Sequence, residues 1–158
     1  PSLNQMILNQ GSSSKVYIGQ PVFDAYGVMG QVIQYSYVTS KVLLITDPRF
    51  AIPVKDSRSG VRAIAVGQGA GKPLKLINLL NTADVNKDDV FISSGLGMVF
   101  PEGYPVGIVL SNMKSSDVLL QISARMSQAD QVLLVWPGQK KMTGDIQAEL
   151  KKSVVTNV

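Results

Sequence analysis

The chain has 158 residues, 45% of them hydrophobic, with a formal net charge of +4, no cysteine and no histidine. This length fits one domain or two very small ones, and about two-thirds of the unfolded surface can be buried on folding. The missing cysteine excludes disulfides, thiolate catalysis and cysteine-based zinc sites. The missing histidine excludes Ser-His-Asp and Cys-His catalysis and histidine-ligated zinc. Most hydrolase mechanisms are therefore excluded.

The positive charge does not indicate nucleic-acid binding. The basic residues from Lys15 to Lys72 are interleaved with acids, and no basic stripe carries interleaved aromatics. No apolar run approaches the roughly 20 residues of a transmembrane helix. The chain opens on Pro1 rather than Met and lacks a basic segment followed by an apolar one, so we expect targeting information to lie outside it, in a longer protein.

Strand-length apolar segments separated by turn signals recur about every ten residues, which is typical of β-sandwiches and barrels. In chain order they are 5–11, 15–38, 41–47, 50–67 with a turn at 56–60, 75–80, 88–95, 104–113, 116–126 and 130–136. The segment 142–154 differs, because it has a possible N-cap at Thr143 and apolar residues at helical spacing. We expect a short or frayed C-terminal helix there.

Two glycine-containing motifs raise the question of catalysis or phosphate binding. Ser93 and Ser94 precede Gly95, but a nucleophile elbow needs glycine where Ile92 stands, and no histidine base is available. The segment 66–73 resembles a phosphate loop, yet Val66 replaces its first glycine and Pro73 replaces its Ser or Thr. We interpret the serines as turn residues and 66–73 as a hairpin loop.

The acidic residues at 84–89 suggest a calcium loop only weakly. Asp84, Asn86 and Asp88 have the right spacing, but the glycine at loop position six and the glutamate at position twelve are missing. Adjacent Asp88 and Asp89 would point to opposite faces of a strand, which is poor geometry for an acid-base pair. A polar turn is the favoured interpretation, and no metal, cofactor or catalytic residue is predicted.

A loose internal echo favours two similar units over one large barrel. Residues 27–32 (GVMGQV) resemble 103–109 (GYPVGIV), and 40–45 (SKVLLI) resemble 116–122 (SDVLLQI). Two barrels of roughly six strands each fit the length and hide their sheet edges.

Four segments together carry a resemblance to a known family. GQPVFDAYGVMGQV, TSKVLLITDPRFAIPV, GVRAIAVGQG and SGLGMVFPEGYPVGIV occur in this order and at these separations. They resemble the periplasmic part of the rod shape-determining protein MreC of Gram-negative bacteria, over roughly 7–136. One departure is visible: the family usually has Gly-Asp where this chain has Asp88-Asp89, so we expect that turn to be altered or strained.

The resemblance implies a fold and a role. The fold would be all-β, with two β-barrels of trypsin-like topology in the periplasm. The longer protein would add a coiled coil and one inner-membrane helix. The family is a non-enzymatic scaffold of the elongation machinery that maintains rod shape; it associates with itself, MreD, the actin-like MreB, RodA and the class B transpeptidase PBP2. A catalytically inactive protease-like module, or a carbohydrate-binding module using Trp136, is the alternative.

The resemblance leaves the domain boundaries and the partner site open. We expect a first barrel from 1–46 plus 110–137, an inserted second barrel at 47–109 and a tail at 138–158; the alternative is a sequential split near 67–71. In the glycine-rich motif, Phe100 and Tyr104 are predicted to pack in the core, or, if exposed, to anchor a partner.

Overall fold

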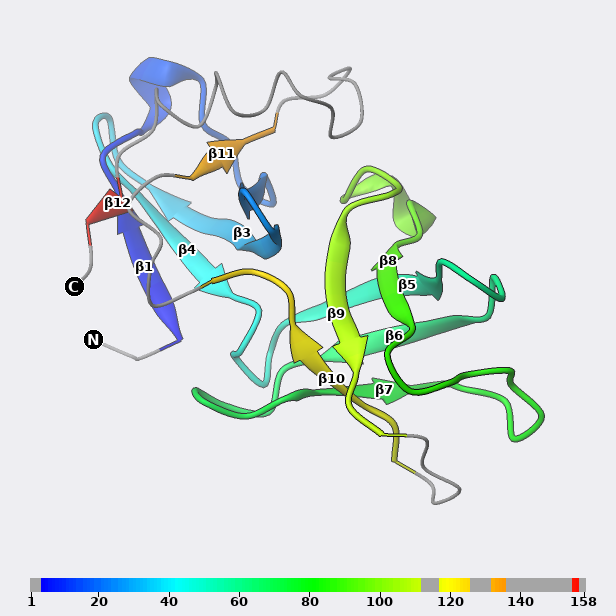
Figure 1. The fold of residues 1–158 in the computed structure, drawn as a ribbon. Coiled ribbons are helices and arrows are strands. Elements are labelled where there is room, and N and C mark those ends of the chain that lie inside the picture. Colours follow the sequence, from blue (N-terminus) through cyan, green and yellow to red (C-terminus); the bar gives the residue numbers. More distant parts are fainter. Residues whose placement is uncertain (1–3, 112–116, 126–131, 136–154, 157–158) are drawn as a thin grey trace.

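The computed structural model describes residues 4–111, 117–125, 132–135 and 155–156. Regular structure in these ranges consists of strands and two short 3-10 turns, η1 at Ser12–Ser14 and η2 at Leu96–Met98. Figure 1 shows the strands in two groups, and the chain passes from one group to the other after β4. The prediction of an all-β fold is confirmed.

The first group is an antiparallel six-stranded sheet in the order β11-β2-β3-β4-β1-β12. Its strands are β1 (Gln5–Leu8), β2 (Pro21–Asp24), β3 (Gly27–Tyr35), β4 (Ser40–Leu44), β11 (Leu133–Leu134) and β12 (Val155–Thr156). Met6, Leu8 and Val42 pack with Val132 and Leu134 in one apolar cluster on this sheet. In the described part of the chain β11 and β12 are its edges, so closure into a second barrel remains a prediction, as does the trypsin-like topology.

The second group is a closed barrel in the order β10-β7-β6-β5-β8-β9. Its strands are β5 (Ala51–Asp56), β6 (Arg62–Val66), β7 (Leu74–Ile77), β8 (Val90–Ser93), β9 (Pro105–Val109) and β10 (Leu119–Ile122). Burial alternates along β5, where Ile52 and Val54 point into the barrel. This period-two pattern is what a strand with one buried face requires. The prediction of a six-stranded barrel is confirmed for this unit.

The chain enters the barrel after β4 and returns to the open sheet with β11 and β12. β10 pairs with β7 and β9, although the expected boundary at 109/110 assigned it to the first unit. The sequence of a short apolar strand does not determine which strand it pairs with, because the pairing depends on the connections that place it beside its neighbours. The alternative split near 67–71 would divide the barrel, because these residues connect its paired strands β6 and β7. β12 likewise pairs with β1, although 138–158 was expected to be a tail outside the sheets. The rest of the division into domains remains a prediction.

The turn between β2 and β3 lies against the start of β9 and so joins the two units. Asp24 Oδ1 accepts hydrogen bonds from the Tyr26 and Gly27 backbone N–H groups, and its Oδ2 accepts one from the Arg125 N–H at 2.6 Å. Gly27 has φ +156°, and a Cβ there would lie 2.3 Å from the Pro105 carbonyl oxygen. Only glycine permits this close approach of two backbones.

Two of the sequence predictions fall outside the described ranges. They are the helix expected at 142–154 and the packing of Trp136. Within the ranges that the structure does describe, no helix has the length and hydropathy needed to span a membrane.

Candidate partner-binding groove

Phe100 and Tyr104 are both buried, with 4% and 1% of their surfaces exposed. Tyr104 stacks on Phe23 of β2, with ring centroids 4.2 Å apart, and Phe100 meets Phe50 edge-on at 5.8 Å. Burial also raises the pKa of the Tyr104 phenol. Both rings therefore pack in the core, which is the first of the two predictions, and neither has the exposure that the partner-anchor alternative required.

The loop between β8 and β9 is organised around Ser93. Its hydroxyl donates to the Pro101 carbonyl at 2.6 Å and accepts from the Tyr104 N–H at 2.9 Å. Its carbonyl accepts from the Gly103 N–H at 2.9 Å. Ser94 Oγ accepts from the Leu96 N–H at 3.3 Å. Both serines therefore shape the turn, as predicted, and the fully buried Ser93 hydroxyl is engaged by the backbone.

The same loop carries an apolar tip, defined as Leu96, Met98 and Val99. These side chains are 63%, 93% and 49% exposed. Gly95 and Gly97 on either side of Leu96 both have φ 77°, in the left-handed region that favours glycine. The sequence analysis did not predict this tip. The available signal was three aliphatic residues around Gly97, in a segment whose glycines are typical of a turn and not of a strand that could bury them.

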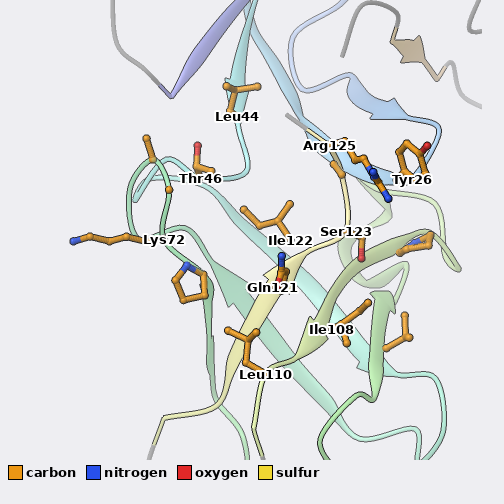
Figure 2. Close-up of a pocket in the computed structure, with 16 residues that line it drawn as sticks. Tyr26, Leu44, Thr46, Lys72, Ile108, Leu110, Gln121, Ile122, Ser123 and Arg125 are labelled. Carbon is orange, nitrogen blue, oxygen red and sulfur yellow. The ribbon is translucent and has the colours of Figure 1, made fainter. Parts of the chain in front are cut away.

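A groove of about 1110 Å³ lies where the open sheet meets the barrel (Figure 2). Tyr26 and Leu44 come from the open sheet and its turn, and Ile108 and Ile122 come from the barrel. The described residues that line it are Tyr26, Leu44, Thr46, Ala70, Gly71, Lys72, Pro73, Val90, Pro105, Ile108, Leu110, Gln121, Ile122, Ser123, Ala124 and Arg125. Pockets for small ligands usually measure roughly 300–1,000 Å³, so this groove is large enough for a protein segment.

Antiparallel pairing creates the apolar floor of the groove. Ile108 on β9 lies opposite Val90 of β8 and Gln121 of β10. Its side chain is 40% exposed on the outer face of the barrel, and Leu110 just beyond β9 is exposed to a similar extent. Exposed aliphatic side chains in a concave site mark a surface that can bind an apolar partner.

Among the described residues that line the groove there are two cations, Lys72 and Arg125, and no acid. No ion pair joins either cation to a carboxylate among the described residues. The Arg125 guanidinium lies over the Tyr26 ring at 4.4 Å, an arrangement stabilised by the ring quadrupole. An occupant that is apolar and neutral or acidic therefore matches the groove better than a basic one.

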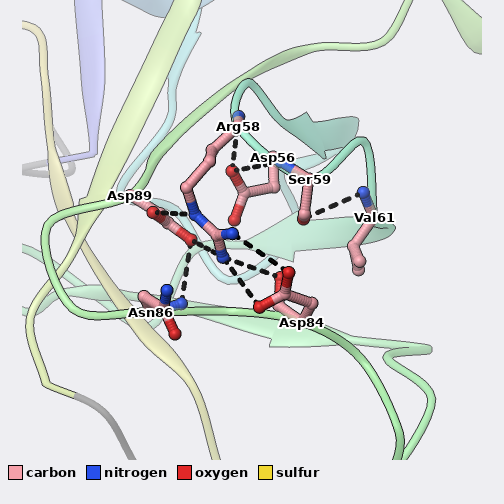
Figure 3. A network of polar contacts seen from close by, with 7 residues as sticks. All are labelled: Asp56, Arg58, Ser59, Val61, Asp84, Asn86 and Asp89. Carbon is pink, nitrogen blue, oxygen red and sulfur yellow. Dashed lines mark hydrogen bonds and ion pairs between the residues drawn. The ribbon is translucent and has the colours of Figure 1, made fainter.

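Arg58, in the turn between β5 and β6, binds two carboxylates from the β7–β8 connection (Figure 3). Its Nε and one terminal nitrogen donate to Asp89 at 2.9 Å each, and the terminal nitrogens donate to Asp84 at 2.9 and 3.0 Å. These hydrogen bonds lower the pKa of both carboxyls. Asp84 and Asp89 thus hold the connection against the barrel, as the favoured polar-turn interpretation implies.

Two further acids in this region show how the turn is built. Asp56 is buried; its Oδ1 accepts from the Arg58 N–H at 2.8 Å, and its Oδ2 accepts no hydrogen bond from the residues that the structure describes. Burial raises the pKa of Asp56, and the neighbouring Asp89 raises it further. Asp88 has φ 68°, which an aspartate adopts less readily than glycine. The expected strain at Asp88 is confirmed.

Comparisons with known proteins agree with these features. The family model described as "Rod shape-determining protein MreC, barrel core" matches residues 1–136. The cell shape-determining protein MreC of Haemophilus influenzae is 42% identical over 84% of this chain and 39% of its own length. The Escherichia coli protein of the same name is 40% identical over 86% of this chain and 38% of its own length. The chain thus spans about two fifths of the length of these curated relatives.

Solved structures give the same result. The crystal structure of MreC from Pseudomonas aeruginosa is 41% identical, with a TM-score of 0.80 over 84% of this chain and 89% of that one. Two more distant structures share the fold. One, from a complex between PBP2 and MreC of Helicobacter pylori, is 19% identical with a TM-score of 0.57. The other, a major periplasmic domain of the cell shape-determining filament MreC, is 21% identical with a TM-score of 0.65. The chain belongs to the family of the rod shape-determining protein MreC.

Proposed function

We propose that this chain is the partner-binding part of a non-enzymatic periplasmic scaffold that organises peptidoglycan synthases and maintains rod cell shape. The observation that carries the proposal is the groove, a large apolar site at the meeting of two sheets, whose described lining residues include cations but no acid. Relatives named cell shape-determining proteins support the cellular role. In the full-length protein this part would be anchored to the inner membrane.

The proposed occupant of the groove is the periplasmic part of a class B transpeptidase of the PBP2 type. The distant MreC of Helicobacter pylori has been solved in complex with PBP2, which supports a partner of this class. We propose MreD, RodA and MreB as further partners through the elongation machinery, and self-association of the scaffold itself.

The chemistry of the described residues supports binding rather than catalysis. The chain has no histidine or cysteine, and the Ser93 hydroxyl donates to a backbone carbonyl. A carbohydrate-binding role gains no support from the groove, because Arg125 covers one face of Tyr26, the aromatic in the lining. A sugar stacking there would have to displace the guanidinium.

A cell-shape experiment tests the proposed role. The full-length protein carrying Ile108→Lys replaces the resident copy in a rod-shaped host, with Leu80→Lys as the matched control. Both residues are exposed, but Leu80 is not in the lining of the groove. We expect round cells with Ile108→Lys and rods with Leu80→Lys, at equal protein levels. Rods with both variants would contradict a role for the groove.

A further inference from the structure

The carboxyl of Asp56, at the end of β5, has an oxygen that no donor reaches. The side chain is 1% exposed, and its Oδ1 accepts from the Arg58 N–H at 2.8 Å. Its Oδ2 is fully enclosed and accepts no hydrogen bond from the described residues. An ionised carboxylate in this setting has lost its water without gaining a second donor, which is unfavourable. The position of this group therefore calls for a physical explanation.

The buried carboxyl of Asp89 is a hydrogen-bonding neighbour of Asp56, and Figure 3 shows both beside Arg58. Two ionised carboxylates are acceptors only and cannot hydrogen-bond to each other. One proton turns such a pair into a donor and an acceptor. The Arg58 side chain donates to both oxygens of Asp89 at 2.9 Å, and also to Asp84, so Asp89 is the member that stays ionised. The proton therefore belongs on Asp56.

In the described part of the chain, the charged side chains that face Asp56 are Arg58 and Asp89. Lys55, its neighbour on β5, points to the opposite face of the strand. β8 places the uncharged Phe91 opposite Asp56. The other charged residues of the neighbouring elements are exposed to solvent: Arg62 of β6, and Lys87 and Asp88 of the β7–β8 connection.

The end of the β7–β8 connection also fixes the floor of the groove. The Asp88 N–H donates to the Val109 carbonyl, and the Val109 N–H donates to the Asp89 carbonyl, both at 2.9 Å. Val109 stands between Ile108 and Leu110, two residues of the groove lining. A displacement of Asp89 is therefore transmitted to the groove through two backbone hydrogen bonds.

We propose that Asp56 and Asp89 share one proton, and that this proton holds the β7–β8 connection in the position that shapes the groove. The latch, defined as Asp56, Arg58 and Asp89, is closed when Asp56 donates its proton to Asp89. When the proton leaves to water, two buried negative charges face each other with one guanidinium to balance them, and the connection loosens. The consequence for binding rests on the proposed function, in which the groove holds the transpeptidase.

Carboxyl-carbon NMR of the isolated chain tests the shared proton. Asp56 should titrate above the value of about 3.9 that is usual for aspartate, because burial and Asp89 both raise its pKa. In Asp89→Asn an amide replaces the second carboxylate, so the Asp56 midpoint should fall by about one unit or more. Asp84→Asn, which changes an exposed acid on the same arginine, should leave the midpoint nearly unchanged. An Asp56 midpoint at or below about 3.9, or one that Asp89→Asn does not lower, would overturn the proposal.

Hydrogen exchange of the Val109 N–H measures the latch in the same chain. Its protection, corrected for the intrinsic pH dependence of exchange, should fall as pH rises through the Asp56 midpoint. Linkage sets the size: about tenfold for each unit by which that midpoint exceeds the unfolded value. In Asp56→Asn the amide donates at every pH, so protection should not depend on pH. A constant protection in the wild type, or an equal fall in Asp56→Asn, would refute the latch.

Affinity for the periplasmic part of the transpeptidase, measured on both sides of the Asp56 midpoint, connects the latch to the groove. The wild type should bind at least about fivefold more weakly above the midpoint, whereas Asp56→Asn should keep its affinity. A fall that is equal in the two proteins, or absent from both, would overturn this connection. The NMR and exchange measurements need no partner, so a chain that binds no transpeptidase at any pH contradicts the proposed function and not the latch.

Discussion

Tyr104 of the barrel and Phe23 of the open sheet stack on each other, with ring centroids 4.2 Å apart and planes inclined by 27°. Both rings are buried, and the stack crosses from one sheet to the other. Beside it, Gly27 approaches the Pro105 carbonyl. The orientation of the two sheets, and with it the shape of the groove, depends on this joint.

Removing the Tyr104 ring should destabilise the whole chain. Tyr104→Ala leaves a cavity where a fully buried ring packs on Phe23, and we expect the free energy of unfolding to fall by about 3–5 kcal/mol. Urea denaturation measures this change. Tyr37→Ala is the matched control, because Tyr37 is exposed and should change stability by less than about 0.5 kcal/mol. Similar losses in the two variants would refute the assignment of Tyr104 to the core.

Replacing Asp88 with glycine should stabilise the chain. Asp88 is exposed and has φ 68°, and its N–H donates to the Val109 carbonyl, a bond that the substitution keeps. Relief of the left-handed strain should raise the free energy of unfolding by up to about 1 kcal/mol, after the greater freedom of glycine in the unfolded chain is subtracted. Thermal melting checks the sign. Asp88→Ala keeps the strain and should not stabilise; equal gains in both variants would mean that charge, not backbone strain, is responsible.

Asp56→Asn should stabilise the chain at neutral pH. The amide keeps Oδ1 as acceptor for the Arg58 N–H and puts a donor in the place of the unpartnered Oδ2. Burial and the neighbouring Asp89 raise the pKa of Asp56 in the folded chain. The stability gained from protonating Asp56 is therefore fully present below the unfolded pKa of about 3.9 and is lost as pH rises through the folded pKa. The gain should therefore be about 1 kcal/mol at pH 7.5 and vanish near pH 3.

Urea unfolding at these two pH values measures the difference between Asp56→Asn and wild type. Asp56→Ala removes both oxygens and should destabilise the chain at either pH, because the turn loses its acceptor. A gain from Asp56→Asn that is equal at both pH values would contradict the role of the buried charge.

Arg58→Gln should change the acid sensitivity of the fold. The hydrogen bonds that Arg58 donates are the largest cause that holds the pKa of Asp89 below its usual range, and the neighbouring Asp56 makes a smaller contribution. The resulting stability is present above the unfolded pKa of about 3.9 and is lost as pH falls through the folded pKa. We expect the variant to be less stable at pH 7 and to lose less stability on acidification from pH 4 to pH 2. Parallel curves for the two proteins would show that Arg58 does not set this dependence.

The strands and their turns could be predicted from the sequence, whereas the groove could not. The turn predicted at 56–60 carries local turn chemistry and lies where expected, between β5 and β6. The internal sequence repeat also has a structural counterpart. Its first copy lies on β3 and β4 and its second on β9 and β10, and in each copy the two strands pair antiparallel. Local signals of this kind do not depend on tertiary structure.

What could not be predicted depends on long-range pairing. Leu44, Lys72 and Ile108 come together in the groove only because the barrel closes beside the open sheet. The burial of Phe100 and the exposure of Met98, two residues apart in one motif, are likewise decided by the fold around the loop. The sequence therefore predicted core packing for the aromatic Phe100, with exposure as the alternative, and had no local signal that Met98 is exposed.

The most direct test of the groove as a protein-binding site is calorimetric binding of this chain to the purified periplasmic part of its PBP2-type transpeptidase, at physiological salt. We predict saturable binding by the wild type, binding at least about tenfold weaker with folded Ile108→Lys, and wild-type affinity with Leu80→Lys. Equal affinity of the wild type and Ile108→Lys, or no binding by any of the three, would contradict the account.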